Sequence, residues 1–127
     1  MQGKPETISR ALLLVGAING ALVVGLGAYG AHALTDAGAV GRFQTAVLYH
    51  MFHTLGIVAI GAVAATRTHA LLLALAGAVM LLGIVLFCAG LYVAAIAGYG
   101  GLLRFAPFGG ASFIVAWVLF AAGACRR

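Results

Sequence analysis

The sequence predicts an all-α fold: an integral membrane four-helix bundle with short loops, in one domain over residues 1–127. Two observations support this prediction. First, 65% of the residues are hydrophobic and only 7% are charged, and the mean hydropathy is +1.17. A water-facing surface needs far more charge than this. Second, four stretches lack Asp, Glu, Lys and Arg, and each exceeds the ~20 residues that cross a bilayer.

The four spans are expected at residues 11–33, 44–65, 70–97 and 106–125. The uncharged stretch 68–103 is too long for one straight span, and Gly98-Tyr99-Gly100-Gly101 is typical of a turn that ends it. The first span also resembles a signal peptide, with Ala31-His32-Ala33 similar to a cleavage site. Its apolar run is longer than that of a signal peptide, which favours a retained span.

The basic residues predict the orientation. The net charge is +5, but these residues lie in connections and tails, which does not indicate nucleic acid as a partner. One side of the membrane receives Lys4, Arg10, Arg67, Arg126 and Arg127, and the other receives Arg42 and Arg104. The positive-inside rule therefore predicts that both termini are cytoplasmic.

Small residues are expected to hold the helices together. The chain has 19 glycines, and helices in lipid associate through close backbone contact. We expect helix packing at Gly16, Gly20, Gly83, Gly90, Pro107, Gly109 and Gly110. Remaining glycine faces leave open a homo-oligomer or a place in a larger membrane complex. Asn19, deep in the first span, is expected to form an interhelical hydrogen bond.

Placing a polar side chain at membrane depth costs free energy, so each such residue needs a structural or functional reason. The polar residues of the spans are therefore the candidate site. His50 and His53 lie three residues apart on the second span and share a face. Four alternating spans place these histidines and the other polar residues in one half of the bundle. The candidate ligand or polar-cluster residues are His32, Tyr49, His50, His53 and Tyr92, with Asp36, Tyr29 and Ser112 around them.

Three interpretations of this cluster stay open, and one of them is a proton or solute path. Each histidine can hydrogen-bond a hydroxyl or backbone carbonyl of a neighbouring helix, with Tyr29, Tyr49, Tyr92 and Ser112 as candidate partners. Alternatively, neutral imidazoles can bind a metal, with His32 as a third ligand and Asp36 orienting a ring. Haem, a quinone or a lipid-like molecule are the other ligands considered for the same residues.

Four local patterns carry a family resemblance. They are Gly27-Ala28-Tyr29-Gly30-Ala31-His32-Ala33-Leu34, Thr45-Ala46-Val47-Leu48-Tyr49-His50 with His53-Thr54-Leu55, Leu86-Phe87-Cys88-Ala89-Gly90-Leu91-Tyr92, and Ala106-Pro107-Phe108-Gly109-Gly110 followed by Trp117. The chain resembles the domain-of-unknown-function 423 family of small bacterial inner-membrane proteins, whose animal relative is transmembrane protein 256. The third pattern is looser, because Cys88-Ala89-Gly90 stands where Phe-Ser-Gly is expected. The resemblance implies a four-span protein of the bacterial inner (plasma) membrane and supplies no reaction.

An enzyme is the least supported class of function. Glu6 and Asp36 are the only carboxylate side chains, and no phosphate loop or nucleophile motif occurs. We expect a non-enzymatic structural or accessory membrane subunit that contacts the lipid bilayer. The alternatives are a protein that binds haem, a quinone, a metal or a lipid-like ligand, and a small oligomeric transporter or proton path.

Overall fold

The fold is an elongated all-α bundle, which confirms the predicted fold class. The computed structural model describes residues 4–126, and no strand occurs among them. The elements are α1 (Pro5–Ala33), α2 (Ala37–Ala64), α3 (Leu71–Gly83), η1 (Ile84–Ala89), α4 (Gly90–Ala97), η2 (Gly101–Phe105) and α5 (Ala106–Cys125). Residues 1–3 and 127 of the expected domain, including Arg127 of the charge count, lie outside this range.

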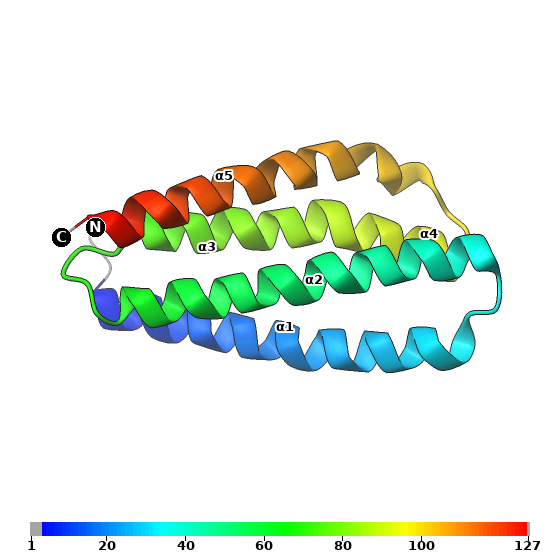
Figure 1. Ribbon diagram of the computed structural model, residues 1–127, viewed down its shortest axis with the longest axis horizontal. Helices are drawn as coiled ribbons and strands as arrows, with labels where there is room; N and C mark the ends of the chain where they lie inside the picture. Colours follow the sequence, from blue (N-terminus) through cyan, green and yellow to red (C-terminus); the bar gives the residue numbers. More distant parts are fainter. Residues whose placement is uncertain (1–3, 127) are drawn as a thin grey trace.

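Four helices are long and apolar enough to cross a membrane. They contain 29, 28, 27 and 25 residues, and the third runs continuously through α3, the π-helical η1 and α4. The two described ends of the chain lie at one end of the bundle, beside the α2–α3 connection (Figure 1). The α1–α2 turn and the α4–α5 connection lie at the other end. This is the alternation that the four expected spans require.

The first two helices start earlier than the expected spans, because a helix can continue beyond the hydrocarbon region, whereas α3 and α5 start within one residue of the expected positions. α1 begins at Pro5, with proline in the first turn, and α2 begins at Ala37. Asp36 caps α2: its carboxylate accepts a hydrogen bond of 2.8 Å from the backbone N–H of Ala39. Asp36 therefore has a local structural role at the start of α2.

The glycine turn after the third helix is confirmed. α4 ends at Ala97, and Gly98 follows with φ of +70°, in the left-handed region. Its backbone N–H donates to the carbonyl of Ala94 at 3.1 Å. Glycine adopts this conformation without the steric cost that a Cβ brings.

α2 and α3 form the middle of the bundle, with α1 against α2 and α5 against α3 and η1 (Figure 1). On the α1 side, a Cβ at Gly16 would lie 2.5 Å from a Val58 methyl group. The hydroxyl of Ser9 also donates to the carbonyl of Gly61 at 2.8 Å. Close backbone approach and an interhelical hydrogen bond thus join α1 to α2.

The glycines expected in packing divide into two groups. At Gly83, Gly90 and Gly109, as at Gly16, a Cβ would meet a neighbouring helix or connection at 2.5–3.0 Å. At Gly20 the nearest such atom is 4.0 Å away, and at Gly110 none lies within 4 Å. Pro107 is exposed in the first turn of α5. Gly110 therefore borders open space instead of a helix contact.

Candidate functional site

His50 joins three helices through a polar cluster that we call the clamp, formed by Asn19, His50 and Tyr92. The His50 side chain is 2% exposed. Its Nε2 lies 3.0 Å from Oδ1 of Asn19 on α1, and its Nδ1 lies 3.0 Å from the Tyr92 hydroxyl on α4. The expected interhelical hydrogen bond of Asn19 is confirmed, as is a hydroxyl partner for His50.

The donor and the acceptor of each hydrogen bond in the clamp can be assigned. The Asn19 amide nitrogen donates to the Val15 carbonyl at 2.9 Å, which leaves Oδ1 to accept from His50. Nε2 of His50 must then carry the hydrogen, and Nδ1 accepts from the Tyr92 hydroxyl. Both ring nitrogens are used within the protein, so His50 has no free lone pair for a metal or another ligand.

His53 has only one of its ring nitrogens paired. Its Nδ1 lies 2.7 Å from the carbonyl oxygen of Tyr49 on the same helix. The described residues supply no hydrogen bond to Nε2, although the side chain is only 4% exposed. The ring stacks on Phe113 of α5, with centroids 3.5 Å apart and an angle of 12° between the planes. The His53 carbonyl partner thus lies on its own helix, where a neighbouring helix was expected.

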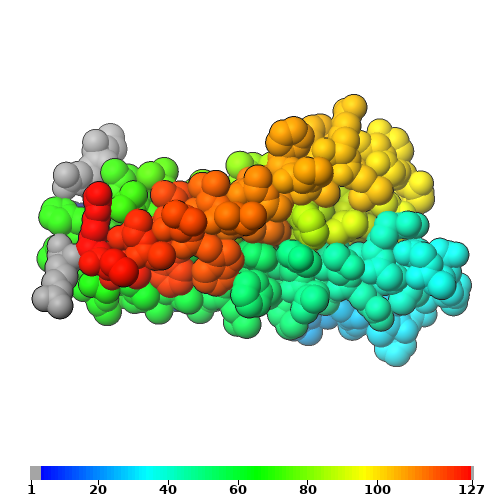
Figure 2. All heavy atoms as spheres, turned by 45° about the horizontal axis from the view of Figure 1, so that its top comes forward, coloured from blue at the N-terminus to red at the C-terminus, as the bar shows by residue number. Residues whose placement is uncertain are grey.

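His53 lines an apolar pocket, which we call the α2–α5 pocket, with a volume of about 570 Å³. Figure 2 shows the face where α5, in orange to red, borders α2, in green to teal. The aromatic lining residues are Tyr49, Phe52, Phe87, Phe113 and Trp117. Gly110 also lines the pocket, so the absence of a side chain there keeps it open.

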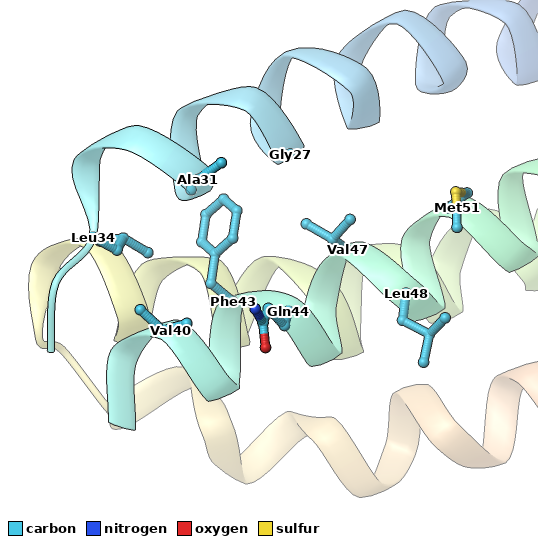
Figure 3. A pocket seen from close by; sticks show the side chains of 10 residues that line it. Gly27, Ala31, Leu34, Val40, Phe43, Gln44, Val47, Leu48 and Met51 are labelled. Atoms are coloured by element: carbon cyan, nitrogen blue, oxygen red, sulfur yellow. The ribbon is translucent and has the colours of Figure 1, made fainter. Parts of the chain in front are cut away.

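A second pocket lies on the other side of α2, against α1, with a volume of about 380 Å³ (Figure 3). Phe43 extends from α2 toward α1 there and packs on the backbone of Gly30. Gln44 is the one amide side chain in its lining. Histidine is absent from this lining.

The structure does not bring the three candidate histidines together. His32 is exposed near the end of α1, thirteen residues beyond Asn19, which is about 20 Å along a helix. Within residues 4–126, no group of three His, Cys, Asp or Glu side chains could hold a metal ion. The predicted role of His32 as third ligand and of Asp36 in orienting a ring finds no geometric basis.

The remaining candidate residues have local partners. Tyr29 is exposed, and its ring lies 6.2 Å from that of Phe43. The Ser112 hydroxyl donates to the carbonyl of Phe108 in its own helix at 2.9 Å. Tyr49 lines the α2–α5 pocket through a ring 4.6 Å from that of Phe87. Of the expected cluster, only Tyr49 and His53 share this pocket.

The aromatic lining was not predicted from the sequence. Phe52 and Trp117 have ring centroids 5.5 Å apart across the two helices, and Phe87 lies in η1. Pairs at helical spacing, Tyr49 with Phe52 and Phe113 with Trp117, were a signal in the sequence. The spacing does not show which aromatic faces meet, because that depends on how the helices pack.

Fold and composition together define the class: a small four-span helical membrane protein. Residues 26–110 match the family described as "Protein of unknown function (DUF423)". The chain belongs to this family, as its sequence patterns indicated.

Curated relatives cover nearly the whole chain. The UPF0382 inner membrane protein YgdD of Escherichia coli (strain K12) is 40% identical over 121 residues, 93% of this chain and 92% of the relative. The UPF0382 membrane protein YwdK of Bacillus subtilis (strain 168) is 35% identical over 120 residues, with coverage of 92% and 98%. A UPF0382 membrane protein of Staphylococcus epidermidis is 33% identical over 113 residues, with coverage of 87% and 91%. No solved structure shows significant similarity to this chain.

Proposed function

We propose that this protein is a non-enzymatic membrane protein that binds a lipophilic small molecule in the α2–α5 pocket. The observation that carries the proposal is the unpaired Nε2 of His53 at the wall of an apolar pocket. An imidazole nitrogen without a hydrogen-bond partner in a membrane-spanning segment is costly, and a polar group on a ligand would satisfy it. The pocket volume of about 570 Å³ falls within the usual range of small-molecule sites.

The distribution of the other polar groups supports a role in binding instead of catalysis. His50 is engaged at both nitrogens by Asn19 and Tyr92. Glu6 lies in the first turn of α1, and Asp36 caps α2. No carboxylate therefore lies beside His53, and acid–base or nucleophilic catalysis by a lone histidine lacks the second group that activates or orients it.

Pocket contents after detergent-free purification test this proposal. The protein is extracted with its native lipids into nanodiscs, and bound molecules are identified by mass spectrometry of an organic extract. Gly110→Leu fills the pocket, and Gly25→Leu is the matched control. Both glycines have open space where a Cβ would stand, and only Gly110 lines the pocket. We expect a lipophilic compound with wild type and Gly25→Leu that Gly110→Leu loses. Identical extracts from all three would contradict the proposal.

A structural or accessory subunit is the second candidate function, supported by the limited burial of α1. Only 17% of its most apolar 18-residue window is buried within the protein, compared with 44% for α2. A helix at the edge of a bundle can pack against another membrane helix, in a homo-oligomer or a larger complex. Native mass spectrometry from lipid nanodiscs tests this: a monomer without a partner at native abundance would contradict it.

The charge count supports an orientation with both termini in the cytoplasm. Within residues 4–126, Lys4 and Arg10 belong to the start of α1, Arg67 to the α2–α3 connection and Arg126 to the end of α5, whereas Arg42 follows the α1–α2 turn and Arg104 lies in the α4–α5 connection. The first set of elements meets at the end of the bundle that carries both termini (Figure 1). To test this orientation, a reporter protein that is active only in the cytoplasm is fused to the carboxyl end, and we expect the fusion to show activity.

A proton or solute path has less support, because both nitrogens of His50 are paired and Asp36 serves as a helix cap.

A further inference from the structure

We infer that the α2–α5 pocket selects a lipid-soluble phenol, whose hydroxyl donates a hydrogen bond to Nε2 of His53. The inference rests on the proposed function, because it names the chemical class of the ligand for the same pocket. It follows from the direction of one hydrogen bond, the aromatic lining and the absence of a cation in that lining.

The hydrogen bond to Tyr49 fixes which nitrogen of His53 can accept. A carbonyl oxygen only accepts, so Nδ1 of His53 carries the hydrogen in the 2.7 Å contact with the Tyr49 carbonyl. In the neutral imidazole, Nε2 then presents a lone pair. A second proton would place an unpaired charge near the middle of α2, in the membrane interior, which is costly. The ligand must therefore donate, which a hydroxyl can do and a ketone or an ether cannot.

The lining favours an aromatic ring as the carrier of that hydroxyl. His53 and Phe113 are stacked, and Tyr49 lies nearly parallel to His53, with 14° between the planes. Phe52, Phe87 and Trp117 complete the aromatic wall. Aromatic rings gain from offset-stacked and edge-to-face contacts with such a wall beyond their burial alone. An aliphatic alcohol supplies the donor but not these contacts.

The charge and exposure of the lining residues narrow the chemical class of the ligand further. The lining contains no Lys or Arg, so an ionised fatty acid would have no counter-ion there. The Tyr49 hydroxyl can donate or accept, so it does not discriminate between ligands. Leu48 and Ile114 line the pocket with 58% and 68% of their surface exposed. They lie on helices that face lipid, so an apolar tail of the ligand can extend into the bilayer.

Trp117 supplies a direct readout, because it is the single tryptophan of the chain and lines the pocket. The probes are a 4-alkylphenol with bromine on its alkyl chain, the methyl ether of that phenol, and a brominated alkanol of matched length. Each is titrated into full-length protein in lipid nanodiscs while quenching of Trp117 fluorescence is followed. Concentrations are expressed per lipid, which corrects for partition into the bilayer.

We expect the phenol to reach half-maximal quenching at a concentration about tenfold lower than its methyl ether, as for the loss of one hydrogen bond at a buried acceptor. The alkanol should be weaker than the phenol. His53→Phe keeps an aromatic ring against Phe113 but removes the acceptor, so phenol and ether should become equal. Gly110→Leu should weaken every probe, and Gly25→Leu should weaken none.

A measurement on wild type keeps the test valid even if a variant misfolds. The nitrogen-15 resonance of His53 Nε2 should shift on addition of the phenol and not of the ether. Equal quenching by phenol and ether that Gly110→Leu still abolishes would overturn the inference and leave the proposed function standing. Equal binding of phenol and alkanol would overturn the aromatic part. Quenching that does not depend on Gly110 for any probe would count against both.

Discussion

His50 and His53 lie three residues apart on α2, yet they face different surroundings. His50 points into the clamp, where Asn19 and Tyr92 occupy both of its nitrogens. His53 faces α5, where one nitrogen is paired with Tyr49 and the other is left at an apolar pocket. Three residues correspond to about 300° of helical rotation, so the two side chains diverge by about 60°.

Burial alone does not identify a structural histidine. The side chains are almost equally buried, at 2% and 4% exposure. They differ in the number of hydrogen bonds, and a complete set of partners is what makes a buried polar group a stable cross-link.

Removal of each histidine should have unequal consequences for stability. His50→Leu should lower the free energy of unfolding by about 2 kcal/mol, because buried Tyr92 and half-buried Asn19 both lose their partner. His53→Leu should cost under about 1 kcal/mol, because the Tyr49 carbonyl keeps its backbone hydrogen bond within α2. Equilibrium unfolding in mixed micelles measures both. Equal losses would show that the clamp contributes nothing beyond packing.

Alanine substitution at the two adjacent glycines of α5, Gly109 and Gly110, should change the free energy of unfolding in opposite directions. A Cβ at Gly109 would lie 2.6 Å from the backbone nitrogen of Phe87, which cannot move aside easily. Gly109→Ala should therefore cost about 1–3 kcal/mol through overpacking. Gly110→Ala should leave stability unchanged or raise it by up to about 1 kcal/mol, since Ala favours helix over Gly. The same unfolding measurement applies, and similar values for the two variants would contradict the arrangement of α5 against η1.

The two outer members of the clamp should be coupled. Asn19→Leu and Tyr92→Phe each remove one hydrogen bond to His50, and each should cost about 1 kcal/mol. The double variant should cost less than the sum, because each single variant already weakens the hold on the same imidazole. A double-mutant cycle measures this coupling. Strict additivity would mean that the two hydrogen bonds act independently.

The smallest effect involves no change in stability. Nitrogen-15 NMR of histidine-labelled protein in lipid should show His50 protonated at Nε2 and His53 protonated at Nδ1. These opposite tautomers follow from the partners, since Asn19 Oδ1 and the Tyr49 carbonyl can only accept. The same tautomer at both residues would contradict the contrast between the clamp and the α2–α5 pocket.

Much of the fold was predictable because it depends on local composition. Uncharged stretches gave the four helices, and Gly98 gave the end of the third. The pairing of Asn19 was predictable too, since an amide in lipid needs a partner. Which residue pairs with Asn19 could not be predicted, because the choice of partner depends on how far each helix rotates and slides against its neighbour.

The candidate site was harder to predict from the sequence than the fold. Alternating spans place residues only toward one end of the bundle or the other, and His32 lies thirteen residues along α1 from Asn19 of the clamp. The sequence also offers no periodic signal for η1, whose π-helical turn places Phe87 beside Gly109. Helical periodicity assumes a uniform 3.6 residues per turn, and that assumption fails at this turn.

The π-helical turn of η1 has a consequence for how this protein can vary. It lies between Gly83, which packs on Phe113, and Tyr92, which completes the clamp. A π-helical turn holds one residue more than an α-helical turn, so deleting one residue within η1 would restore a regular α-helix and keep Tyr92 turned toward His50. Deleting one residue from α3 instead would rotate everything that follows by about 100° relative to the contacts before it. The π-helical turn is therefore the place where the third helix can lose one residue and keep the clamp, while the position of Phe87 in the wall of the pocket changes.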